Sequence, residues 1–269
     1  MDVLLTRKAV NEAHSISQTS TEGYSKLEIE PLELTFLVLE EKFKTWVFSL
    51  MKEHANLEKA LQQGKEDMVQ NFFVKWNEKK RASGFEMLDG TKIQLYDAAL
   101  ADSLVISSHR PHHRSYVKIV GENKAFSVSL GKSERSQAFN YMHRYMLMQG
   151  RPFMYGYLTN LKDLIVFKIQ SEGRNSRFFE SAPISFPDAY PILLSLCSLS
   201  EEACGLDYEG LPTEFQIEGF LGLGATSQVF EVKERISNST FAWKKVKQGN
   251  VFVVCCPTSR ISNSISFPF

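Results

Sequence analysis

The sequence predicts an α+β (α/β-like) protein. Apolar residues recur at helical spacing between residues 31 and 80, and Pro31 suits a first helical turn. After Gly84 the apolar period shifts towards two, which is typical of strands, and a further helical pattern interrupts the strands at 133–149. Helices, strands, a helix and more strands in this order indicate a mixed sheet covered by helices.

The elements of the sheet follow from short apolar runs. Asp89-Gly90 lies between two such runs and predicts a hairpin over 85–93. Three further strands are predicted at 103–107, 116–120 and 164–169, and a short helix at 192–199.

Five segments are expected along the chain. The polar N-terminus predicts a flexible arm, and an acidic, Gly-containing stretch predicts a linker between two folded parts. The segments are an arm at 1–30, a helical and α/β domain at 31–200, a linker at 201–214, a small β piece at 215–248 and an irregular tail at 249–269.

Composition sets limits on partners and compartment. Lys and Arg together number 31, as do Asp and Glu, so binding to nucleic acid would need a local basic patch. The four cysteines show neither metal-ligand spacing nor a disulfide framework, which fits a reducing compartment. The sequence has no apolar signal core and no stretch that approaches a membrane span. We therefore expect an intracellular protein, cytoplasmic or nuclear, with no membrane partner.

Three charged residues in the middle of the chain predict a catalytic site. Asp102 comes directly before the predicted strand 103–107, and Glu122 and Lys124 lie at the end of the next strand, two residues apart on one side. Two carboxylates from neighbouring strands can share a hard divalent cation. A lysine beside them can orient an attacking water, which is chemistry suited to phosphodiester hydrolysis. If the register differs, Asp97 is the alternative to Asp102.

Residues 85–170 resemble restriction-endonuclease-like nuclease domains, which carry an Asp…(Asp/Glu)-x-Lys motif followed by a helix that often bears a Gln. The resemblance implies a restriction-endonuclease-like mixed sheet with nucleic acid as partner. It implies Asp102 and Glu122 as Mg²⁺ ligands, with Lys124 as the catalytic lysine and Gln137 as an accessory. A further Glu from the preceding helices is implied, and the open alternatives are Glu33, Glu40, Glu41 and Glu58.

A basic loop follows the strand 103–107. It contains His109, His112 and His113, together with two arginines and a proline, but no Cys or carboxylate at metal-ligand spacing. The loop could contact phosphates near the predicted site. A solvated hairpin loop is the interpretation that the composition favours.

The small β piece carries a Gly-rich turn and a lysine on a later strand. Glycines let backbone N–H groups approach phosphates, and a lysine supplies a point charge for them. Residues 215–248 resemble the first three strands of a protein-kinase N-lobe. The resemblance implies residual ATP-binding elements at Leu221, Gly222, Gly224, Val229, Ala242 and Lys244.

Departures from the kinase pattern limit the expected activity. Ser227 replaces the third glycine, and Trp243 stands where the family carries an aliphatic residue. No Asp or Glu follows Glu234, so neither a carboxylate partner for Lys244 nor the metal-binding and catalytic aspartates of a kinase are present. We expect a truncated kinase-like piece with weak or vestigial ATP binding and no phosphotransfer.

Two functions remain open from the sequence. The first is a metal-dependent nuclease, which requires Asp102, Glu122 and Lys124 to converge. The second is a non-catalytic interaction or regulatory module, in which the helices of 31–80 bind a protein partner. Nuclease-like and kinase-like modules occur together in crinkler-type proteins, which the chain resembles in this respect.

Overall fold

The computed structural model describes residues 24–63, 68–69, 71–73, 84–90, 101–110, 112–172, 175–207, 211, 214–223, 227–246 and 254–255. The predicted arm as far as residue 23 and all of the predicted tail except residues 254–255 lie outside this range. The chain divides into two compact units. The larger spans Ala13–Met146 and Arg151–Leu206, and the smaller includes Asp207–Phe269. Helices and strands occur together throughout the larger unit, which confirms the α+β class.

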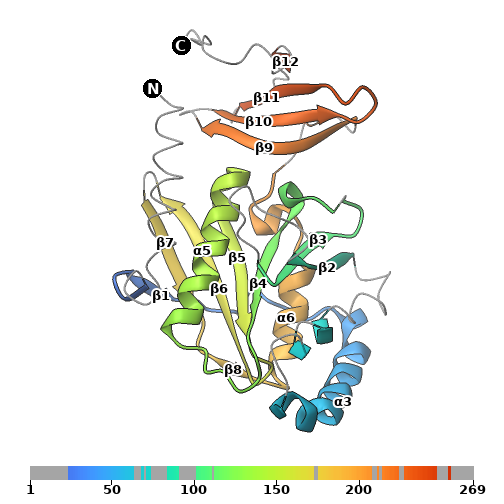
Figure 1. The fold of residues 1–269 in the computed structure, drawn as a ribbon, viewed down its shortest axis with the longest axis vertical. Coiled ribbons are helices and arrows are strands. Elements are labelled where there is room, and N and C mark those ends of the chain that lie inside the picture. The colour runs from blue at the N-terminus through green and yellow to red at the C-terminus, as the bar shows by residue number, and fades with distance from the viewer. Residues whose placement is uncertain are drawn as a thin grey trace. The chain divides into compact units, whose positions relative to one another are not determined.

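A mixed sheet forms the centre of the larger unit (Figure 1). Its order in the described residues is β1-β7-β6-β5-β4-β3-β2, with β8 paired to β6. β4 and β5 are parallel, as are β1 and β7, and the other pairs are antiparallel. The strands are β1 (Ile29–Pro31), β2 (Phe85–Asp89), β3 (Ser103–Ser107), β4 (Ile119–Asn123), β5 (Phe153–Thr159), β6 (Asp163–Glu172), β7 (Asn175–Glu180) and β8 (Ile184–Ser185).

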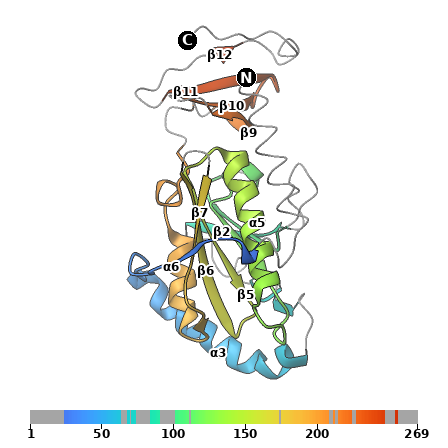
Figure 2. The same cartoon turned by 90° about the vertical axis from the view of Figure 1, so that its left-hand side faces the viewer.

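Helices cover both faces of this sheet. The helix α5 (Lys132–Gln149) joins the parallel strands β4 and β5 and lies on one face, whereas α3 (Glu41–Gln63) and α6 (Ala189–Ser198) lie on the other (Figures 1 and 2). α5 packs tightly, because a Cβ at Gly156 of β5 would lie only 2.5 Å from Sδ of Met142. Side chains of α3, α6 and the sheet form one buried apolar cluster on the opposite face, including Phe43, Val47, Leu50, Val105, Tyr157, Val166, Leu193 and Leu194.

The N-terminal part of the predicted helical region is wrong. The helix begins at Glu41, and Pro31 ends the edge strand β1 instead of opening a helix. β1 runs parallel to β7, and the N–H of Leu32 donates to the carbonyl of Glu180 at 2.8 Å. Proline is tolerated on an edge strand because its missing N–H costs no ladder bond there. Pairing of β1 with a strand almost 150 residues away therefore overrides the helical preference that the local spacing of apolar residues indicates.

The second run of the hairpin predicted over 85–93 lies outside the described residues. β2 ends at Asp89 and pairs with β3 along its whole length, from Phe85 opposite Ser107 to Asp89 opposite Ser103. The next predicted strand, 116–120, is displaced along the chain. The structure has a 3-10 turn, η2, at Arg114–Tyr116, and β4 spans Ile119–Asn123. As a result Glu122 lies inside a strand and not beyond its end.

The smaller unit contains an antiparallel sheet in the order β12-β11-β10-β9. Its strands are β9 (Phe215–Leu223), β10 (Ser227–Glu234), β11 (Thr240–Val246) and β12 (Val254–Cys255). Ile217, Phe230, Val232 and Trp243 are buried together, and the rings of Phe230 and Trp243 stack with centroids 5.4 Å apart. Trp243 is therefore a core residue of this sheet, which accounts for its place beside Lys244.

Among the helices that the structure describes, none has the length and apolar character needed to cross a membrane.

A partly buried histidine of α5, His143, makes the stability of the larger unit depend on pH. Nε2 of His143 lies 3.2 Å from Oγ of Ser176, its ring packs against Phe178, and burial lowers the pKa of His143 to about 4. The unfolded chain therefore binds an extra proton between about pH 6.5 and 4, so the folded state loses stability as pH falls through this window.

We expect His143 to lower the free energy of unfolding by about 1–2 kcal/mol between pH 7 and pH 5. The variant His143→Gln keeps a polar partner for Ser176. It should remove this loss of stability, because glutamine does not titrate. Urea unfolding at pH 7 and pH 5 measures the difference, with the exposed His109 replaced by glutamine as the matched control. Equal losses in the wild type and in His143→Gln would contradict the prediction.

Candidate active site

Glu122 and Lys124 form a buried ion pair at the end of β4. Lys124 Nζ lies 2.6 Å from Oε1 of Glu122, and only 1% of the Glu122 side chain and 11% of that of Lys124 are exposed. The alternation of a strand places residues two apart on one side of the sheet, so the pair follows directly from the sequence. Lys124 continues the line of β4, since its N–H donates to the carbonyl of Thr159 in β5 at 2.8 Å.

Gln137 reaches the same lysine from the helix. Its Oε1 accepts a hydrogen bond from Lys124 Nζ at 3.0 Å, and its Nε2 donates to the hydroxyl of Tyr141 at 3.2 Å. Gln137 and Tyr141 lie one helical turn apart on α5, which places both over the end of β4. The helix that follows the Glu-x-Lys motif therefore positions the lysine amine.

Asp102 lies at the start of β3, next to Glu122. Ser103 pairs with Gly121 in the antiparallel register, so the preceding and following residues, Asp102 and Glu122, are neighbours across the strands. Asp102 Oδ2 accepts a hydrogen bond from the N–H of Asn123 at 2.8 Å. Burial raises the pKa of Tyr141, and the negative charges of Glu122 and Asp102 raise it further. The negative charges of Glu122 and Asp102 therefore both lie close enough to Tyr141 to raise the pKa of its hydroxyl.

The structure thus brings Asp102, Glu122, Lys124 and Gln137 together from three elements, β3, β4 and α5. Tyr141 is a member of this cluster that was not predicted as a site residue. Its four-residue distance from Gln137 is the signal that could have identified it, because residues four apart on a helix share a face. Asp97, the alternative to Asp102, lies outside the described residues.

The acidic residues of the cluster suit magnesium better than zinc. In the part of the chain that the structure describes, no group of three or more His, Cys, Asp or Glu side chains is arranged to hold a metal ion. Asp102 and Glu122 are two oxygen donors, and Mg²⁺ binds through one or two carboxylates while keeping several waters. Zinc sites need three or four protein ligands. The donor set therefore fits a hard cation that retains water.

The additional glutamate implied by the resemblance is not found among the described candidates. Glu33, Glu40 and Glu41 are exposed, and the last two pair with Lys42 and Lys44. The side chain of Glu58 lies outside the described residues.

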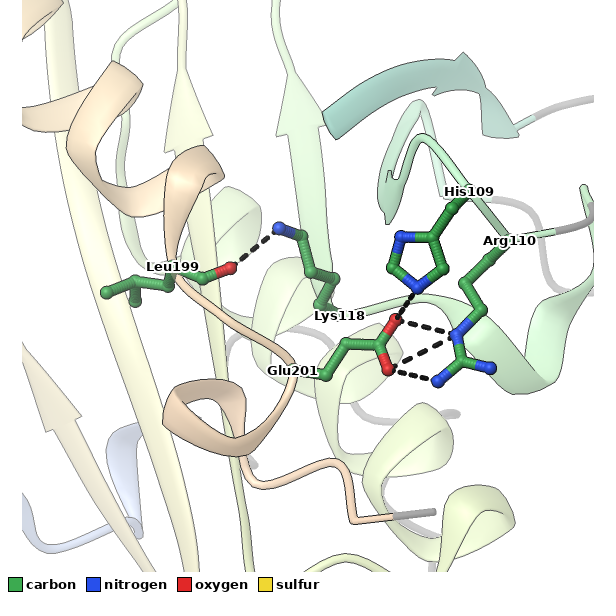
Figure 3. A network of polar contacts seen from close by, with 5 residues as sticks. All are labelled: His109, Arg110, Lys118, Leu199 and Glu201. Carbon is green, nitrogen blue, oxygen red and sulfur yellow. Dashed lines mark hydrogen bonds and ion pairs between the residues drawn. The ribbon is translucent and has the colours of Figure 1, made fainter. Parts of the chain in front are cut away.

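The basic loop does not belong to this cluster. It follows Ser107, at the opposite end of β3 from Asp102. Arg110 donates three hydrogen bonds to Glu201, at 2.9, 3.2 and 2.6 Å, and His109 lies 3.8 Å from the same carboxylate (Figure 3). Hydrogen bonds and the positive charge of Arg110 lower the pKa of Glu201 against the effect of its burial. The loop is thus tied to the segment after α6.

Lys118, which precedes β4, also contacts the segment at the end of α6. Its side chain is 2% exposed, and Nζ donates to the carbonyl of Leu199, the residue that ends α6, at 2.7 Å (Figure 3). A cation at a helix C-terminus satisfies a carbonyl and interacts favourably with the helix dipole. Burial lowers the pKa of Lys118, and nearby Cys204, Cys197 and Glu201 oppose this shift. Lys118 is best explained as the C-terminal cap of α6.

The predicted ATP-binding residues lie on β9, β10 and β11. Gly222 pairs with Val229, and Val229 pairs with Lys244 on its other side. Ala242 pairs with Glu231, and Leu221 is 40% exposed. Gly224 lies outside the described residues. Gly222, Val229 and Lys244 therefore lie opposite one another on three adjacent antiparallel strands.

Comparisons of the chain with protein-family models, with curated proteins and with solved structures find no match.

Proposed function

We propose that the larger unit is a metal-dependent phosphodiesterase acting on nucleic acid. The observation that carries the proposal is the convergence of Asp102, Glu122 and Lys124 with Gln137, from three elements that are separate in the sequence. The order of elements supports the resemblance to restriction-endonuclease-like domains. The acidic and basic residues lie on two adjacent antiparallel strands, a helix with the glutamine follows, and the next strand runs parallel to the second.

Each residue has a distinct part in this proposal. Asp102 and Glu122 would hold a Mg²⁺ ion, which when bound lowers the pKa of water and neutralises phosphate charge. Lys124, oriented by Gln137, places a positive charge where negative charge develops on the phosphate oxygens. Attack by water forms a new P–O bond and releases one proton to solvent, the ester P–O bond breaks, and the leaving sugar oxygen takes up a proton.

Metal binding tests the proposal without relying on activity. A titration of the full chain with Mn²⁺, followed by calorimetry, should show saturable binding that Asp102→Asn and Glu122→Gln each remove. Glu41→Gln, which changes a carboxylate with 83% of its side chain exposed, is the matched control and should bind as the wild type. Saturable binding that survives Glu122→Gln, or none in the wild type, would refute the proposed site.

The non-catalytic interaction module remains the alternative proposal. It makes no use of the four converging residues, and it predicts that substitutions among them change stability alone.

For the smaller unit we propose weak ATP binding at most. Val229 and Lys244 lie side by side, as an adenine-and-phosphate site of the kinase kind needs, but Ser227 stands where the kinase pattern has a third glycine that lets the backbone approach the phosphates. We expect a fluorescent ATP analogue to bind with a dissociation constant of about 1 mM or weaker. Lys244→Met should change this little, with Lys233→Met as control. Micromolar binding that Lys244→Met abolishes would contradict the expectation.

A further inference from the structure

A buried amide lies directly behind the carboxylates of the candidate site. Asn123 follows Glu122 in β4, is fully buried, and points to the other face of the sheet. Its Nδ2 donates to Oγ of Ser103 at 2.6 Å, and the hydroxyl of Ser103 donates in turn to the phenol oxygen of Tyr157. Among the described residues, no donor reaches the Oδ1 atom of Asn123. A buried acceptor of this kind loses its hydrogen bonds to water without replacement and therefore destabilises the fold.

Stability therefore does not account for the choice of asparagine. Asn123 lies on the face of the sheet that also carries Tyr157, a member of the buried apolar cluster, and its polar neighbours there are Ser103 and Thr159. A valine at position 123 would suit a buried strand and would leave no orphaned acceptor. Ser103 would keep its hydrogen bond with Tyr157. A polar group that is partly satisfied in such a place calls for a functional explanation.

Asn123 connects the two strand ends on both faces of the sheet. On the side of the site, its backbone N–H donates to Asp102 at 2.8 Å. On the covered side, its carboxamide bonds to Ser103, the residue after Asp102. The last pair in the β3–β4 register is Ser103 with Gly121, so these two bonds hold the strands together beyond the ladder.

We infer that Asn123 is a positioning residue, which sets the distance and orientation of Asp102 relative to Glu122 through Ser103. This inference rests on the proposed function, because it concerns how the same two carboxylates bind a metal ion. Residues that orient ligands typically change metal affinity about 10- to 100-fold when they are replaced. Asn123→Val should therefore weaken Mn²⁺ binding while leaving the fold intact.

The experiment measures Mn²⁺ affinity by calorimetry and the melting temperature by circular dichroism, on the full chain. The variants are Asn123→Val and Ser103→Ala. Ser181→Ala is the matched control, because Ser181 is also a buried serine that accepts a cross-strand hydrogen bond, from Val166 N at 3.0 Å. We expect about tenfold weaker binding in both test variants and wild-type affinity in the control, with the melting temperature of Asn123→Val within about 3 °C of wild type.

The outcomes separate this inference from the proposed function. Wild-type affinity in both test variants would overturn the positioning role and leave the metal site standing. A melting temperature lowered by more than about 5 °C in Asn123→Val would assign Asn123 to the stability of the fold and also overturn the inference. If the wild type shows no Mn²⁺ binding that Glu122→Gln removes, the proposed function fails and the inference fails with it.

Discussion

Replacing Lys124 by alanine is expected to abolish metal-dependent cleavage and to destabilise the larger unit. The substitution leaves the carboxylate of Glu122, which is 1% exposed, without its ammonium partner at 2.6 Å. Breaking a buried ion pair from one side costs about 3–5 kcal/mol, because the remaining charge is uncompensated. Loss of a positive group at the reacting phosphate should lower cleavage to about 1% of wild type or less. Urea unfolding and a cleavage assay measure the two effects.

A double substitution separates stability from activity. Glu122→Leu together with Lys124→Met removes both charges, and buried pairs replaced by apolar residues usually lose little or no stability. We expect the double variant to unfold within about 1 kcal/mol of wild type and to show no cleavage. Lys44→Ala, at an exposed lysine of α3, is the control. Full cleavage by the double variant would show that the pair has no catalytic part.

Replacing Gly121 by alanine is expected to destabilise the larger unit through a steric clash in the core. A Cβ at this position would lie 2.2 Å from Cζ and 2.4 Å from the hydroxyl of Tyr157, well inside contact distance. Tyr157 is completely buried, so its ring has no space into which to move. Overpacking in a core costs about 1–3 kcal/mol and occasionally more, and a backbone shift at Gly121 would displace Glu122 as well. Thermal unfolding measures the loss.

Second substitutions at Tyr157 identify the cause. Tyr157→Phe keeps the overlapping ring atoms and should not rescue Gly121→Ala, whereas Tyr157→Leu removes them and should recover most of the stability. Gly131→Ala is the control, since its Cβ would meet only the flexible carboxylate of Glu134, at 3.2 Å. Rescue by phenylalanine equal to that by leucine would contradict the steric explanation.

Local patterns in the sequence account for part of the candidate site. Glu122 and Lys124 meet because strand residues two apart share a face, and Gln137 and Tyr141 share a face because they are one helical turn apart. The approach of α5 to β4 and the pairing of Asp102 with β4 depend on tertiary packing. The places of Asp102 and Glu122 on neighbouring predicted strands indicate that these two residues approach each other, whereas only the resemblance to nuclease domains implies the approach of Gln137.

The error at Pro31 has a clear physical cause. The local pattern predicts a helix that includes Pro31. In the structure Pro31 belongs to β1, which pairs with the distant strand β7. Edge pairing satisfies backbone N–H and C=O groups whatever the local side-chain pattern is, so it is not visible in a short window of sequence.

Cleavage of nucleic acid tests the central claim most directly. The purified full chain is incubated with single- and double-stranded DNA and RNA in Mg²⁺ or Mn²⁺, beside Glu122→Gln and the control Glu41→Gln. The proposal predicts metal-dependent cutting by the wild type and the control, and none by Glu122→Gln. No cutting of any substrate by folded wild-type protein, or cutting that persists in Glu122→Gln, would contradict it.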